Sequence, residues 1–290
     1  MTSFSKSLDM DVRQGLDLRS IDTVTPEEIN AHLVDSWSFR QPLYNLYANS
    51  LMLDYAPDFA KLHRWGSDFF GRTPENTLLL AVQNLHSYMM LGWETGILNT
   101  FHTLRRNGLT KGQIMELVMF CQLYAGMRGL GHVYRAVGDM LAVFAAPEVA
   151  PTFPEGWAVE PGAFKCGLDL STRALTESDR ANLIGWYERT IGQVPRSIAF
   201  GIKHHPEFVK VNRAKWEATI KTLPKQVAPY VMLRHHTITG SRDGLREAAL
   251  LGKAWGMTSE WIVLGITGTA MYFTGFEGLY AAADAVDDLL

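Results

Sequence analysis

One glutamate in the first half of the chain is the side chain best suited to acid–base chemistry. Glu94 lies beside Trp93 and follows the apolar residues Met89, Met90 and Leu91. Burial among apolar side chains raises the pKa of a carboxyl group, which can then act as a general acid or a general base. The alternative interpretation is an exposed charge on the outer face of a helix.

Two histidines are candidate partners of this glutamate. His102 follows Glu94 by eight residues, so on one helix the two would lie about 80° apart around the axis and ~12 Å apart along it. They would border one cavity at two levels without touching. His132 opens a predicted helix after a glycine-rich turn, where a helix N-terminus can help to hold an anion. We therefore predict Glu94, His102 and His132 as catalytic residues; each histidine could instead be a packed structural residue.

Five further side chains are predicted to bind a substrate: His86, Tyr88, Trp93, Arg128 and Tyr134. His86 precedes Trp93 by seven residues and should share its helix face. Tyr88 and Trp93 would shape a dry pocket, while Arg128 would hold a carboxylate. Taken singly, each of these residue types is more often structural than functional.

The composition limits the possible partners. The chain has 290 residues, 47% hydrophobic and 20% charged, with a formal net charge of −3. These values are ordinary for a globular protein and give no electrostatic reason to expect nucleic acid or an anionic membrane. No apolar run approaches the ~18 residues of a membrane span. Cys121 and Cys166 form no CxxC pair, which argues against a disulfide framework or a thiolate zinc site and favours the cytoplasm.

Helix-start signals and glycines predict a helical protein. Thr25-Pro26 and Thr73-Pro74 each place a capping threonine before a proline at the first helical position. Thr110 and Gln113 match a capping box. No alternating run of β-branched residues is bounded by hairpin turns. Three helices are predicted in the first half, at roughly 75–107, 110–124 and 132–144; the glycines at 126, 129 and 131 follow a helix, which favours a tight turn over a phosphate loop.

An internal repeat relates the two halves at a shift of 148 or 149 residues. Matching pairs include Gly92/Gly240, Gly96/Gly244, Gly108/Gly256, Tyr124/Tyr272 and Gly126/Gly275, and upstream Pro57, Lys61 and Arg64 match Pro206, Lys210 and Arg213. The repeat preserves turn formers, and therefore a backbone. Trp93, Glu94 and His102 fall on Ser241, Arg242 and Leu250, so the candidate site belongs to the first copy. We predict an N-terminal arm at 1–25, a first repeat at 26–145, a surface-draped Pro-rich linker at 146–175 and a second repeat at 176–290.

The sequence GLTKGQIME at 108–116, followed by YAG at 124–126 and GLGHVYR at 129–135, resembles the carboxymuconolactone decarboxylase family. The helix with His102 to Arg105 is similar to that of AhpD-like proteins. The match covers about residues 55–145 well and 205–290 faintly. The resemblance implies an all-α fold of two tandem helical repeats that form a pseudo-dimer, with homo-oligomeric rings that are trimeric or hexamer-like.

The resemblance also bears on the reaction. AhpD-like peroxidases carry a CxxC pair and a histidine on the helix before Gly108, and these positions fall here on Trp93, Gly96 and Thr100. Since disulfide exchange needs a thiolate, no thiol peroxidase is expected. The decarboxylases' glutamate and histidine fall on Gly96 and Thr100, whereas this chain offers Glu94 and His102.

The function implied by the resemblance is a carbon–carbon lyase of decarboxylase type, in aromatic compound catabolism. It would need neither a cofactor nor a metal, and would act on a small oxidised acid or lactone by general acid/base chemistry. Alternatives are an isomerase or hydrolase for a similar small molecule, or a non-catalytic binding or assembly protein with the same fold.

Overall fold

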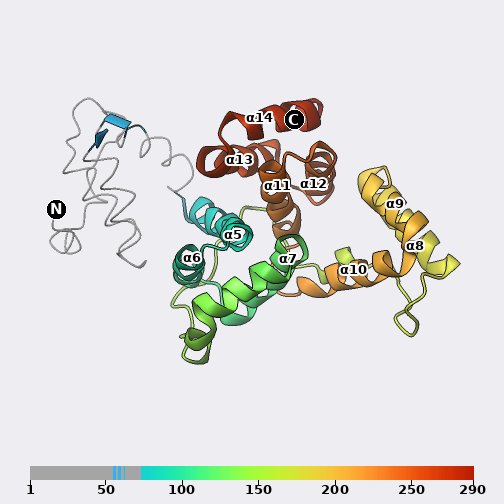
Figure 1. The fold of residues 1–290 in the computed structure, drawn as a ribbon, viewed down its shortest axis with the longest axis horizontal. Helices are drawn as coiled ribbons and strands as arrows, with labels where there is room; N and C mark the ends of the chain where they lie inside the picture. The colour runs from blue at the N-terminus through green and yellow to red at the C-terminus, as the bar shows by residue number, and fades with distance from the viewer. Residues whose placement is uncertain (1–54, 57, 60–61, 63–72) are drawn as a thin grey trace.

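The computed structural model describes residues 55–56, 58–59, 62 and 73–290. These residues form helices and connecting segments with no β-strand among them (Figure 1), so the all-α prediction is confirmed for this part of the chain. None of the helices described has both the length and the apolar character to cross a membrane. The predicted N-terminal arm, the helix start at Thr25 and the matches at Pro57, Lys61 and Arg64 lie outside the described residues.

Three helices of the first half pack on one another: α5 (Pro74–Leu91), α6 (Glu94–Arg106) and α7 (Lys111–Ala142). The capping signals operate as predicted. The Thr73 side chain accepts a hydrogen bond from the amide of Asn76, and Thr110 and Gln113 form a reciprocal capping box. Helix α5 is the central element, since ten of its residues are buried.

The single helix predicted at 75–107 is wrong, because Gly92 divides it into α5 and α6. Gly92 adopts a left-handed conformation with φ 71° and ψ 30°, and its amide donates to the carbonyl of Tyr88. A glycine can take this conformation without the steric penalty of a Cβ atom. The break places Glu94 in the first turn of a new helix rather than inside an apolar one.

Helix α7 is interrupted once, at Gly126, which has φ 71° and ψ −177°. The helix resumes directly, so Gly129 and Gly131 are helical rather than part of a longer turn. Gly129 permits close packing on α5, since a Cβ there would lie 3.2 Å from the carbonyl oxygen of Met89.

The Pro-rich segment after α7 contains one short 3₁₀ helix, η3 (Pro161–Phe164). It does not simply drape over the surface as predicted. Phe164 is fully buried, and its carbonyl accepts a hydrogen bond from the guanidinium of Arg213. The segment is therefore part of the packed structure, because its aromatic side chain contributes to the core.

The second half begins with α8 (Glu177–Ile191), α9 (Arg196–His204) and α10 (Pro206–Thr219), which extend to the right in Figure 1. It continues with α11 (Val227–Thr239), α12 (Arg242–Ala254), α13 (Ser259–Thr269), the π-helical turn η4 (Ala270–Thr274), α14 (Phe276–Val286) and the 3₁₀ turn η5 (Asp287–Leu289). Helix α11 packs against α5, α10 against α7, and α8 against α12. The two halves therefore share one core.

The glycines paired by the predicted repeat have similar φ values in both halves. The φ values of Gly92, Gly108 and Gly126 are 71°, 93° and 71°, and those of their counterparts Gly240, Gly256 and Gly275 are 64°, 85° and 57°. The same turn chemistry thus recurs at the end of α5 and of α11, before α7 and α13, and at the break before the last helical segment of each half.

Candidate functional site

Glu94 belongs to an ion-pair network at the protein surface. Its Oε1 lies 2.5 Å from Nε of Arg135 and 3.1 Å from Nδ1 of His132, and its side chain is 41% exposed. Hydrogen bonds from Arg135 and then from His132 lower the pKa of Glu94. The expectation of a raised pKa is wrong, because the carboxyl group faces two basic side chains at the start of α6 and not an apolar interior.

His132 is held in this network by its contact with Gly92. A Cβ at Gly92 would lie 2.5 Å from Nε2 of the imidazole, so only glycine leaves room for the ring. Nη2 of Arg135 also approaches Nδ1 of His132, at 2.6 Å. One ring nitrogen can donate to Glu94 or accept from Arg135, but not both. Glu94 and Arg135 therefore compete for a hydrogen bond with Nδ1 of His132.

The remaining predicted residues do not form one site. His102 is half-buried on α6 and hydrogen-bonds with no described residue; burial, and then the charge of Arg105, lower its pKa. Arg128 is exposed, and Tyr134 is 76% exposed. Tyr88 and Trp93 do meet, with ring centroids 4.7 Å apart in an edge-to-face arrangement.

His86 faces the second half of the chain instead of sharing a helix face with Trp93, since Gly92 ends α5 before Trp93. It is fully buried, and its Nε2 lies 3.2 Å from Nδ1 of His235 on α11. The ring centroids of these two histidines are 5.2 Å apart.

Four rings from α5, α7 and α11 form what we call the histidine cluster: His86, Tyr124, His235 and His236. The Tyr124 ring centroid lies 6.3 Å from that of His86, 5.1 Å from that of His235 and 6.1 Å from that of His236. Tyr124 is thus the shared neighbour of all three histidines. The adjacent His235 and His236 have centroids 4.9 Å apart.

The histidines of this cluster are held neutral. Burial is the main cause that lowers the pKa of each one, and for His236 it lowers the pKa to about 3. Nδ1 of His86 and Nδ1 of His236 are buried without a hydrogen-bond partner among the described residues. Such unsatisfied nitrogens are uncommon in native structures, and a catalytic role is one explanation for them.

Glu247 on α12 lies at the edge of the histidine cluster. Gly244 packs under the His236 ring, since a Cβ there would lie 2.2 Å from Nδ1, and Glu247 shares that helix face three residues later. Burial raises the pKa of Glu247 to about 7, against the opposing charge of Arg213. The charge of Glu247 in turn adds to burial in raising the pKa of Tyr124. This carboxyl group makes no hydrogen bond with the described residues.

Aromatic side chains from α8, α10 and the Pro-rich segment surround Arg213, the cation whose charge acts on Glu247. We call this group the aromatic wall. The guanidinium carbon of Arg213 lies 3.9 Å from the ring centroid of Trp186 and 4.6 Å from that of Trp216. Nε of Arg213 is paired with Glu217 at 3.1 Å. The wall therefore fixes the cation that faces Glu247.

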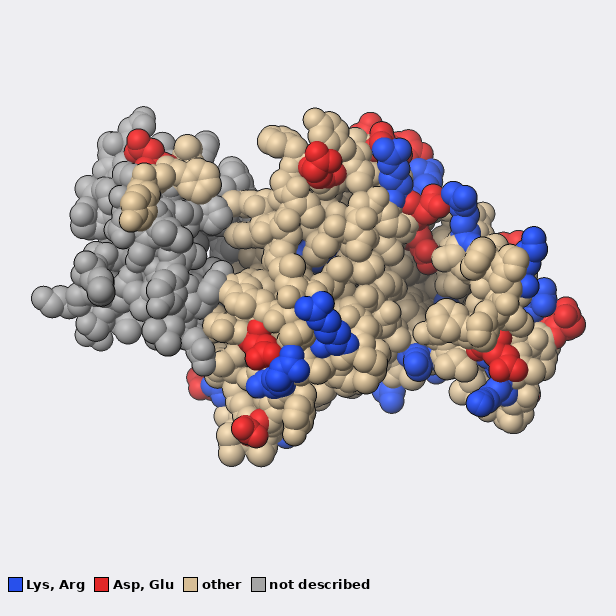
Figure 2. Space-filling model, viewed as in Figure 1, with Lys and Arg blue, Asp and Glu red and all other residues tan. Residues whose placement is uncertain are grey.

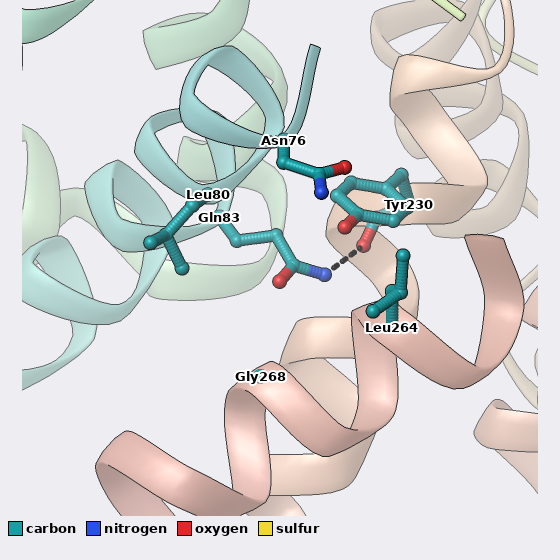
Figure 3. Close-up of a pocket in the computed structure, with 6 residues that line it drawn as sticks. All are labelled: Asn76, Leu80, Gln83, Tyr230, Leu264 and Gly268. Carbon is teal, nitrogen blue, oxygen red and sulfur yellow. Dashed lines mark hydrogen bonds between the residues drawn. The ribbon is translucent and has the colours of Figure 1, made fainter. Parts of the chain in front are cut away.

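A separate pocket opens between α5, α11 and α13. It encloses about 230 Å³ of space, part of it open solvent, and is lined by Asn76, Leu80, Gln83, Tyr230, Leu264 and Gly268 (Figure 3). The Gln83 amide bridges the helices by donating to the carbonyl oxygens of Tyr230 and Gly265, at 3.1 and 3.2 Å. Its walls thus come from both halves of the chain.

Sequence patterns missed most of the histidine cluster. The pair His235-His236 is visible in the sequence, but adjacent residues on a helix point in different directions, which argues against a metal site formed by this pair. Tyr124 and Glu247 have no local signal, since a tyrosine and a glutamate at helical positions are ordinary. No three His, Cys, Asp or Glu side chains in the described part of the chain are placed to hold a metal ion.

Burial raises the pKa of both cysteine thiols, that of Cys166 to about 12.

Neither a scan of protein-family models nor searches of curated proteins and of solved structures find a match to this chain. The family resemblance therefore stays a prediction, and the residues must carry any functional proposal.

Proposed function

We propose that the protein is a cofactor-free acid–base enzyme, a lyase of decarboxylase type that acts on a small oxidised acid or lactone. The active site would be the histidine cluster with Glu247. The observation that carries this proposal is the environment of Glu247. Its pKa of about 7 keeps it partly protonated at neutral pH, on the same helix face as Gly244, which packs against the neutral His236 ring, and this is the state that a general acid needs.

The same residues suit the steps of a decarboxylation. When the bond to the departing CO2 breaks, its electron pair stays on the substrate as an enolate conjugated with a carbonyl group. The Tyr124 hydroxyl, which stays protonated, and a neutral histidine N–H can donate hydrogen bonds to the enolate oxygen. Glu247 then gives its proton to the carbon atom and recovers one from water.

We further propose that the two halves are copies of one helical unit that pack as a pseudo-dimer. A shift of 148 matches His86 with Arg234 and Ser87 with His235. The contacts between the halves are reciprocal under this matching. His86 contacts His235, the counterpart of Ser87, and Ser87 contacts Arg234, the counterpart of His86. An isologous interface has this reciprocity. Assembly of several chains into a ring is a prediction from the family resemblance alone.

This proposal moves the acid–base role from Glu94, His102 and His132 to residues at the junction of the halves. Glu94 has a lowered pKa and two basic partners, which suit an ion pair better than a proton donor. The network of Glu94, His132 and Arg135 is the competing assignment.

Two matched variants decide between these assignments. Wild type, Glu247→Gln and Glu94→Gln are incubated with unsaturated lactone acids and β-keto acids, and CO2 release and ultraviolet absorbance are followed. We expect Glu247→Gln to lower kcat/KM at least a hundredfold and Glu94→Gln to change it less than about threefold. Wild-type activity should fall as the pH rises through about 7, where Glu247 loses its proton.

Other outcomes redirect or reject the proposal. A large loss in Glu94→Gln alone would assign the chemistry to the surface network. A change of absorbance without CO2 would indicate an isomerase or hydrolase. Wild-type protein that turns over no compound of the panel would contradict the lyase and favour a binding or assembly protein.

A further inference from the structure

Arg234 on α11 is a fully buried cation whose hydrogen-bond partners are all neutral. Its Nε donates to Oγ of Ser87 at 2.6 Å, Nη2 to Oδ1 of Asn84 at 2.6 Å, and Nη1 to Oγ1 of Thr269 at 3.3 Å. The guanidinium carbon lies 4.4 Å from the ring centroid of Phe273. Helices α5, α11 and α13 and the turn η4 thus converge on one positive charge.

No carboxylate among the described residues pairs with this charge. The other deeply buried cations of the described part have acidic partners: Lys210 lies 2.7 Å from Asp179, and Arg213 lies 3.1 Å from Glu217. Burial lowers the pKa of Arg234 to about 10, so it is still charged at neutral pH. An isolated buried charge is costly unless a counter-ion compensates it, and the site is therefore suited to an anion.

The pocket of Figure 3 lies between α5, α11 and α13, three of the elements that surround this guanidinium. Tyr230 is one helical turn before Arg234 on α11, Gln83 is next to Asn84 on α5, and Gly268 precedes Thr269. Over α5, α11 and α13 the face in Figure 2 has few Lys, Arg, Asp or Glu side chains, which gather toward its margins. An anion that enters between these helices would meet Arg234 as its principal cation.

We propose that Arg234 binds the carboxylate of a small aryl or unsaturated acid at the seam of α5, α11 and α13. A guanidinium has five N–H donors, and three of its hydrogen bonds are used within the protein. The two N–H groups that are left match the two oxygens of a carboxylate. One cation balances the single charge of a carboxylate, whereas a phosphate at neutral pH carries nearly two charges.

The neighbouring rings define the rest of the ligand. Tyr88 and Phe273 have ring centroids 5.9 Å apart, and Tyr230 lines the pocket, so a flat, conjugated substituent fits best. His86 and His235 directly adjoin Ser87 and Arg234 in the chain. This inference rests on the proposed function where it names the substrate. The ion pair with Arg234 would stabilise the carboxylate and so anchor the acid. The bond that breaks in the reaction would then be in another part of the substrate.

The test compares a charged ligand with its neutral counterpart. Benzoate and benzamide have the same ring, and only benzoate has a carboxylate. Isothermal titration of the full chain should give a dissociation constant for benzoate at least tenfold lower than for benzamide, and benzoate should raise Tm. Arg234→Lys keeps the charge but loses the planar fork, and should weaken benzoate binding at least tenfold. Arg242→Lys, at an exposed arginine paired with Asp284, is the matched control and should bind as wild type does.

The wild-type titration keeps the proposal testable even if Arg234→Lys fails to fold. Equal affinity for benzoate and benzamide, or binding of neither, would overturn the carboxylate site; so would inorganic phosphate that binds more tightly than benzoate. The two proposals fail separately. Benzoate binding with no turnover would reject the enzyme alone, and turnover that Arg234→Lys leaves unchanged would reject the anchor alone.

Discussion

Replacing Gly244 by alanine tests the packing that holds the histidine cluster together. A Cβ at this position of α12 would lie 2.2 Å from Nδ1 and 2.4 Å from Cε1 of His236. Carbon atoms do not approach non-bonded neighbours this closely, so the imidazole must move. Its ring also contacts Tyr124 and His235, and these side chains leave it little freedom.

The expected loss of stability follows from two opposing effects. Alanine is favoured over glycine in a helix by about 0.5–1 kcal/mol. An extra methyl group in a well-packed site costs ~1–3 kcal/mol. The difference of these two magnitudes spans about 0–2.5 kcal/mol. We therefore expect Gly244→Ala to lower the free energy of unfolding by roughly 1 kcal/mol, and to lower turnover because His236 is displaced.

The matched control is Gly131→Ala in α7, where the nearest side-chain atom to the added Cβ is Nη1 of Arg135 at 3.9 Å. It should be as stable as wild type or more stable by up to about 1 kcal/mol. Urea unfolding of the three proteins measures the difference. If Gly244→Ala is as stable as Gly131→Ala, the His236 ring does not pack on α12, and the placement of Glu247 beside it is wrong.

Three other tests give measurable outcomes. Gly92→Ala and Gly240→Ala both force alanine into a left-handed conformation, which costs about 1–2 kcal/mol. Only the Cβ at Gly92 would also overlap a side chain, at 2.5 Å, so we expect Gly92→Ala to have the lower free energy of unfolding in urea. Equal free energies of unfolding would contradict that packing. Lys210→Met leaves Asp179 buried without its cation and should lower the free energy of unfolding by about 3–5 kcal/mol at pH 7. The ion pair lowers the native pKa of Asp179, so its contribution to stability is present above the unfolded pKa of ~3.9 and is lost as the pH falls. The difference in unfolding free energy between variant and wild type should therefore shrink at pH 3. Glu247→Gln should be more stable than wild type at pH 8.5 and should lose that advantage by pH 5. The reason is that a native pKa raised to about 7 makes the ionised carboxylate unfavourable in the folded protein above that pH. A stability difference that is the same at both pH values would refute the raised pKa.

The sequence by itself determined the features that depend on near neighbours in the chain. The caps at Thr73 and Thr110 were predictable, because a hydroxyl group and an amide three residues later bond within one turn. Glycine alone tolerates a positive φ, so the matching glycines also foretold where turns occur. Gly92 was harder, since a glycine inside an apolar helical pattern is compatible with both a continued helix and a helix end.

Only the tertiary structure decided which polar groups meet and how they are charged. His86 and His235 are separated by 149 residues in sequence, yet their ring nitrogens are 3.2 Å apart. Glu94 and Glu247 are both helical glutamates, but their pKa values shift in opposite directions. Arginine and histidine contacts lower the first, whereas burial raises the second. A pKa depends on every charge and dipole within several ångströms, and that neighbourhood is set by how the helices pack rather than by the residues on either side in the chain.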